Sequence, residues 1–308
     1  MLDLLASTLR MAVPLLFAGV GGLLCERSGV ATICLEGALL AGAWTAAVVN
    51  LATGDPWLGA LAAMAAGSLT LALHAGLTQA AKADAIVSGV AVNLFVAGLT
   101  PILNKALYAS PTNTPSIPLE QRFHAVAIPG LSKLPFVGEL LFHQSPLVYL
   151  ALLAPAIVAI ALSRTRWGLR LIAAGEGSEA LFTVGVSPAR VRAGALIVGG
   201  AITALGGAFL STAHASQFTR DMTAGRGYIA LAALIFGGWK PIPTAAACLL
   251  FALADAGQIR IQSAPEGSWL AALPVQVVQS LPYLVTLAAL IFLGKRARPP
   301  AAIGSTHG

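Results

Sequence analysis

Residues 85–103 read AIVSGVAVNLFVAGLTPIL, a run of 19 residues without a charged side chain. A helix needs about 20 predominantly apolar residues to cross the hydrocarbon core of a bilayer. The run therefore predicts a membrane-spanning helix, and the rest of the chain repeats its pattern.

Further apolar stretches lie on both sides of this run. One of them is interrupted by Gly237-Gly238-Trp239-Lys240-Pro241, which predicts two short helices or a re-entrant hairpin. We expect an all-α integral membrane bundle of roughly 8–10 transmembrane helices, with residues 1–308 forming a single domain. The other predicted spans are Met11–Leu24, Val30–Val49, Trp57–Gln79, Leu147–Leu162, Ala193–Thr212, the interrupted Tyr228–Ala256, and Leu281–Leu293.

The composition agrees with a membrane protein. Hydrophobic residues make up 57% of the chain and charged residues 10%, and the mean hydropathy is +0.83. Soluble domains carry about 25% charged residues, so a soluble enzyme, a disordered chain and a disulfide scaffold are excluded. The net charge of +6 does not indicate nucleic-acid binding, because the basic residues lie between the apolar stretches.

The placement of these basic residues predicts the topology. They are concentrated in residues 164–192 and in the tail, residues 294–308. The positive-inside rule places both segments on the cytoplasmic side. The proline-rich segment 104–146 lies one span away from 164–192, so we expect it to be an external loop.

Sequence signals for catalysis are missing. The chain has no HExxH, no GxSxG and no P-loop motif, so we expect no catalytic residue, no metal site and no bound cofactor. The remaining candidates are polar or flexible positions within apolar stretches, which we assign to a substrate pathway: Glu36, Asn93, Gly237 and Gly238. Structural roles stay open for two of them, because Glu36 can cap its helix or pair with a basic group and Asn93 can bridge two helices.

Four blocks of the chain resemble one family in the same order. Glu26-Arg27-Ser28-Gly29-Val30 with Leu35-Glu36-Gly37 resembles the ERxGVxNIxLEG signature of permease subunits of ABC importers that work with basic-membrane-protein-type lipoproteins. Thr32 stands where that signature commonly has Asn. The superfamily also holds branched-chain amino acid and ribose-type permeases. The other three blocks are Ile86–Thr100, Trp167–Arg192 and Thr223–Trp239.

The resemblance implies an uptake permease in a bacterial inner or plasma membrane, surrounded by lipid, for a nucleoside or a similar heterocycle. It also implies a second related permease subunit, an extracytoplasmic solute-binding lipoprotein, and an ABC ATPase that binds ATP and Mg²⁺ and hydrolyses the ATP. A short helix around Gly168–Gly185 would then dock on the ATPase, with contacts from Arg170, Gly175, Glu176 and Gly185. The alternatives are an ion-coupled secondary transporter or channel, and riboflavin, a sugar or a branched-chain amino acid as the solute.

Overall fold

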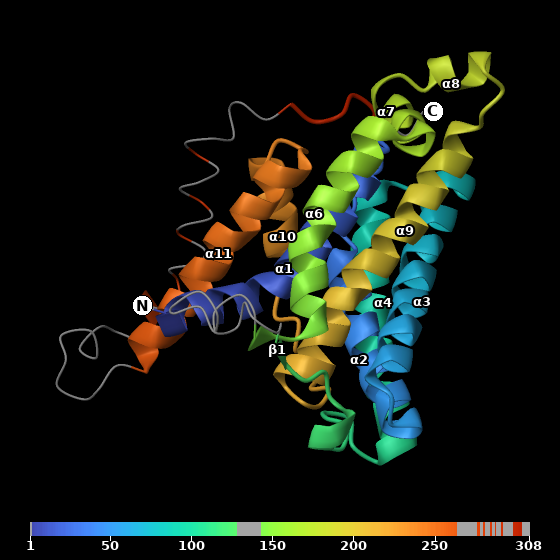
Figure 1. Ribbon diagram of the computed structural model, residues 1–308. Helices are drawn as coiled ribbons and strands as arrows, with labels where there is room; N and C mark the ends of the chain where they lie inside the picture. The colour runs from blue at the N-terminus through green and yellow to red at the C-terminus, as the bar shows by residue number, and fades with distance from the viewer. Residues whose placement is uncertain are drawn as a thin grey trace.

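The computed structural model describes residues 2–127, 143–263 and 298–303, together with isolated residues between 276 and 291. Within this part of the chain, seven helical segments are long and apolar enough to cross a membrane (Figure 1). They confirm the predicted all-α membrane architecture, for which the sequence predicted roughly 8–10 helices over the whole chain. The expected span 281–293 falls almost entirely outside the described residues. The seven segments contain α1 (Leu2–Arg27), α2 (Leu35–Thr53), α3 (Pro56–Ala75), α4 (Ala85–Tyr108), α6 (Pro146–Arg164), α9 (Pro188–Phe209) and α11 (Pro241–Gln262).

The first helix is longer than predicted. The prediction began the span at Met11 and gave a start near Leu4 as the alternative that would lengthen it, and α1 starts at Leu2. The hydroxyl of Thr8 donates to the carbonyl oxygen of Leu4 at 2.7 Å, so this polar side chain is satisfied inside the helix. The helix also continues through Pro14.

Small residues let the central helices pack closely. Helix α9 contacts α1, α2 and α3. A Cβ added to Gly199 would lie 2.6 Å from the carbonyl oxygen of Gly21, so α1 and α9 approach backbone to backbone. Helices associate in lipid mainly through such tight packing, since lipid tails are as apolar as the side chains. One-turn π-helices, η1 (Gly76–Ala80) and η4 (Leu210–His214), extend α3 and α9.

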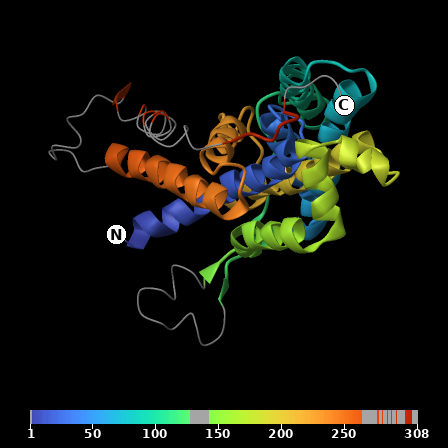
Figure 2. The same cartoon turned by 90° about the horizontal axis from the view of Figure 1, so that it is seen from above.

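The predicted break in the last long stretch is present. Helix α10 (Arg226–Phe236) has 11 residues, which is too short to cross a bilayer, whereas α11 is a full candidate span. The expectation of two short helices is therefore wrong for the second one. The two helices follow one another in the orange part of the chain, and α11 runs beside the first half of α1 (Figure 2).

The connecting segments gather at opposite ends of the bundle (Figure 1). Helices α7 (Arg166–Glu176) and α8 (Glu179–Thr183) lie at one end, and the short strand pair of β1 (Val126–Ala127) and β2 (His143–Gln144) lies at the other. The 3₁₀ turn η2 (Leu119–Gln121) belongs to the segment before β1. Residues 298–303 return to α7, where the Ala302 N–H donates to the Gly175 carbonyl oxygen at 2.8 Å.

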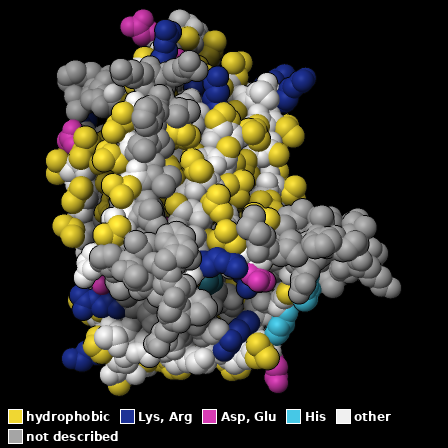
Figure 3. Space-filling view, turned by 90° about the vertical axis from the view of Figure 1, so that its left-hand side faces the viewer, with side chains coloured by type: hydrophobic (Ala, Val, Ile, Leu, Met, Phe, Trp, Pro, Cys, Tyr) yellow, Lys and Arg dark blue, Asp and Glu magenta, His cyan; other side chains and the backbone are white. Residues whose placement is uncertain are grey.

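The surface is that of a membrane protein. Figure 3 shows a band of hydrophobic side chains with Lys, Arg, Asp and Glu gathered above and below it. The two basic segments of the sequence lie at the same end, because the described part of the tail contacts α7. Their shared position agrees with the predicted topology, which stays a prediction.

Candidate functional site

Helix α10 begins inside the bundle, against the first turn of α2. Its N-cap is Gly225, which has φ +80° and no side chain to bond the free amides of the first turn. A Cβ on Gly227 would lie 2.5 Å from the backbone nitrogen of Glu36. Glycine at this position therefore allows the N-termini of α2 and α10 to meet.

Glu36 supplies the acceptor that α10 lacks. Its Oε1 accepts from the Gly225 N–H at 2.7 Å, and its Oε2 accepts from the Gly227 N–H at 2.6 Å. Both helix N-termini carry partial positive charge, which stabilises a carboxylate placed between them. Glu36 thus caps a helix, as one sequence alternative held, but the capped helix is α10 and not its own.

Asn93 joins three segments at the same place. Its Oδ1 accepts from the Gly37 N–H at 2.8 Å, and its Nδ2 donates to the Ile33 carbonyl oxygen at 3.0 Å and to the Tyr228 hydroxyl at 2.9 Å. The amide therefore holds α4 against the start of α2 and the start of α10. This is the bridging role that the sequence left open for Asn93.

A cavity of about 190 Å³ opens beside these contacts. Tyr228 is 47% exposed, and no described residue accepts a hydrogen bond from its O–H. Asp221, in the loop before α10, adds a carboxylate. The arrangement combines an aromatic face with hydrogen-bond acceptors, which suits a polar solute that contains a ring. The polar and aromatic lining residues are Glu36, Asn93, Asp221, Thr223 and Tyr228.

The sequence singled out Glu36 and Asn93 but missed Tyr228 and Asp221. Tyr228 lies in the block of resemblance Thr223–Trp239 and opens the interrupted stretch Tyr228–Ala256, whereas Asp221 lies just before both. An aromatic residue and an acid next to a helix start inside a membrane protein are the signal that could have found them.

Gly237 and Gly238 lie at the other end of α10, in the turn to α11, and not among the described residues that line the cavity. Gly238 adopts φ +60°, which favours glycine. A Cβ on Gly237 would collide with the backbone of Thr244. The two glycines therefore shape the turn between the helices.

The predicted coupling residues fall into a buried and an exposed set. Gly175 is buried in α7, and a Cβ there would run into the carbonyl oxygen of Arg27 at the end of α1. Glu176 pairs with the Arg27 guanidinium at 3.5 Å. Arg170 is exposed on α7, and Gly185 is exposed in the turn after α8 with φ +71°.

A buried polar network, absent from the sequence prediction, links these segments. Glu26 is 5% exposed, and its Oε2 accepts from the Trp239 indole N–H at 2.7 Å, which ties α1 to the turn between α10 and α11. Arg192 is also 5% exposed, and its guanidinium donates to the carbonyl oxygens of Ser28 at 3.2 Å and Ala174 at 3.1 Å. Helices α1, α7, α9 and α10 are therefore connected at one end of the bundle.

Trp239→Phe is expected to lower the free energy of unfolding by about 2 kcal/mol, because it removes the indole donor and leaves a buried carboxylate oxygen without it. Thermal unfolding of the purified chain in detergent measures the loss. Trp57→Phe is the control, since Trp57 is 50% exposed and its edge-on ring contact with Phe123 can be kept. Equal unfolding temperatures for both variants would contradict the prediction.

Comparison with known proteins identifies the class. Residues 4–293 match the family described as branched-chain amino acid transport system / permease component, and the chain belongs to this family. It is a multi-pass membrane protein and a permease subunit of an ABC transporter.

Individual relatives are similar over nearly their full lengths. The guanosine ABC transporter permease protein NupQ of Bacillus subtilis is 36% identical, over 96% of this chain and 93% of its own. A putative glucose ABC transporter permease protein, TsgC13 of Haloferax volcanii, is 37% identical over 94% and 91%. The nucleoside ABC transporter permease protein NupC of Lactococcus lactis is 33% identical over 97% and 94%. No solved structure matches the chain significantly.

Proposed function

We propose that the chain forms the translocation pathway of an ATP-driven importer in a bacterial inner or plasma membrane and that its solute is a nucleoside. The observation that carries the proposal is the cavity at the start of α10, where Tyr228 offers an aromatic face beside Asn93 and two carboxylates. Two of the most similar relatives are named as guanosine and nucleoside permeases, which supports the same solute class.

The chemistry of the cavity suits both parts of a nucleoside. A planar base can stack on the exposed face of Tyr228, and aromatic stacking contributes about 0.5–1.5 kcal/mol beyond the burial of area. The ribose hydroxyls are donors that a carboxylate such as Asp221 can accept. Discontinuous helices commonly form the solute sites of transporters, because their ends provide free backbone groups.

The energy would come from a partner ATPase that binds ATP and Mg²⁺, since the chain has no P-loop. Its docking surface would be the end of the bundle formed by α7 and α8, which we place in the cytoplasm. Apolar side chains are exposed there, a common feature of interaction sites. They are Trp167 at 36%, Leu169 at 69%, Phe182 at 60% and Val184 at 68% relative exposure.

A shift of α7 would be transmitted to the cavity at the start of α10 through a chain of packed contacts. Gly175 and Arg192 hold α7 against α1 and α9, Glu26 joins α1 to Trp239 after α10, and Glu36 holds the opposite end of α10. A rigid-body shift of this kind can alternate access to a central site. A second permease subunit would complete the pathway, and a solute-binding lipoprotein would deliver the nucleoside at the end that carries β1 and β2.

A sugar is the second candidate, because the glucose permease relative is 37% identical over most of the chain. The two solutes make different demands on Tyr228. A base needs the aromatic ring, whereas a sugar can use the hydroxyl and the acids alone.

Uptake of radiolabelled guanosine, uridine and glucose tests the proposal in cells that lack the chain and are complemented with it. Tyr228→Leu is expected to reduce nucleoside uptake about tenfold, because the stacking surface is lost. Tyr228→Phe, the matched control, keeps the ring and loses only the hydroxyl. Glucose uptake without nucleoside uptake would favour the second candidate. Uptake that survives an inactivated ATPase would instead favour an ion-coupled carrier.

A further inference from the structure

A second cavity, of about 450 Å³, lies at the end of the bundle that carries β1 and β2. Three of its side chains are nitrogen donors from three different elements: Arg10 of α1, His143 of β2 and His214 of η4. None of the described lining residues is acidic. No described residue lines both this cavity and the 190 Å³ cavity beside Asn93 and Tyr228, so the two are separate sites.

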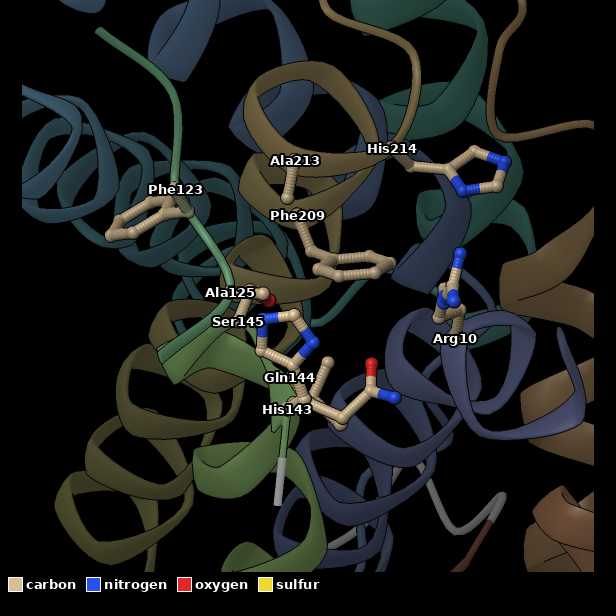
Figure 4. Close-up of a pocket in the computed structure, with 10 residues that line it drawn as sticks. Arg10, Phe123, Ala125, His143, Gln144, Ser145, Phe209, Ala213 and His214 are labelled. Carbon is tan, nitrogen blue, oxygen red and sulfur yellow. The ribbon is translucent and has the colours of Figure 1, made fainter. Parts of the chain in front are cut away.

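The donors surround an aromatic ring. Figure 4 shows the Arg10 side chain pointing towards His214 and the His143 ring below Phe209. The rings of Phe209 and His214 are stacked, with centroids 6.3 Å apart. Gln144 adds a further polar side chain. A ligand held here would meet positive charge on one side and an apolar face on the other.

Helix α6 contributes a buried hydroxyl and its positive end. Ser145 is the N-cap of α6, yet its side chain makes no capping hydrogen bond. The residue is only 9% exposed, and its Oγ has no partner among the described residues. An N-cap serine normally bonds the first-turn amides. Ser145 is among the residues that line the cavity, at a helix N-terminus that favours an anion.

We propose that this cavity binds a phosphate group, carried either by a lipid headgroup or by a soluble phosphate ester. The guanidinium of Arg10 would donate to the phosphate oxygens, as arginine commonly does in phosphate sites. The Ser145 hydroxyl and the two imidazoles would complete the donor set, and the organic part of the ligand would pack on Phe209. The volume lies within the range of about 300–1,000 Å³ that is usual for ligand sites.

Binding is measured by calorimetry on the full chain in its transporter complex, purified in detergent. The probes are inorganic phosphate, dihexanoyl-phosphatidylglycerol, and dihexanoylglycerol, which lacks the phosphate. Arg10→Gln is expected to weaken binding of the phosphate probe about tenfold or more, and Ser145→Ala about threefold. The matched control is Arg260→Gln, which removes an exposed arginine of α11 outside the cavity.

Each outcome of the binding experiment supports or overturns the proposed phosphate site. Tight binding of phosphatidylglycerol that phosphate does not displace assigns a lipid headgroup, and binding of inorganic phosphate alone assigns a soluble ester. If Arg10→Gln does not fold, Ser145→Ala decides by itself, since it removes a hydroxyl without a described partner. The proposal is overturned if neither phosphate probe binds, if dihexanoylglycerol binds as well as phosphatidylglycerol, or if Arg10→Gln and Arg260→Gln bind equally.

Discussion

Glu36→Ala is expected to lower solute uptake to about one hundredth of the wild-type rate. The substitution removes both acceptors of the Gly225 and Gly227 amides, at 2.7 and 2.6 Å. An unsatisfied buried donor costs about 1–3 kcal/mol, so the start of α10 would lose about 3 kcal/mol of anchoring or more. The cavity would then lose the geometry that places Tyr228. Uptake is measured at equal amounts of the chain in the membrane.

Two further variants make this test specific. Glu120→Ala removes an exposed glutamate of η2 and should leave uptake unchanged. Gly227→Ala leaves Glu36 intact, but its Cβ would lie 2.7 Å from the Glu36 Cα, so it should reproduce the loss. If Glu36→Ala transports normally, the carboxylate does not hold the site together.

The sequence predicts those parts of the fold that depend on local pattern. A span follows from the length of an apolar run, and the break before Pro241 follows from two glycines and a proline within five residues. The start of α1 was predicted less well, because Asp3, Thr8 and Arg10 make its first residues less apolar than the rest of the helix.

The candidate site was predictable only where a polar residue stood out. Glu36 and Asn93 were found because polar groups within apolar runs are costly. The hydrogen-bond partners of buried polar residues could not be predicted. Glu36 accepts from amides 189 and 191 positions away, and Glu26 accepts from Trp239 across 213 positions. Pairings at such separations depend on helix packing, which hydropathy does not encode.

Gly175→Ala is expected to reduce uptake about tenfold. The added Cβ would collide with the Arg27 carbonyl oxygen and would lie 3.2 Å from the Gly29 backbone nitrogen. Backbone atoms cannot rotate out of the way as a side chain can, so α7 would shift relative to α1, at a cost of about 1–3 kcal/mol. Uptake and ATP hydrolysis by the assembled transporter are measured together, because a displaced α7 should leave hydrolysis less tightly coupled to transport.

Neighbouring residues supply the controls that separate backbone approach from charge. Gly177→Ala should transport normally, since a Cβ there has nothing within 4 Å. Glu176→Gln breaks an ion pair whose side chains are 23% and 49% exposed, and such a pair contributes about 0–1 kcal/mol, so uptake should change by no more than about twofold. A larger effect of Glu176→Gln than of Gly175→Ala would mean that charge, and not the close backbone contact, fixes α7 against α1.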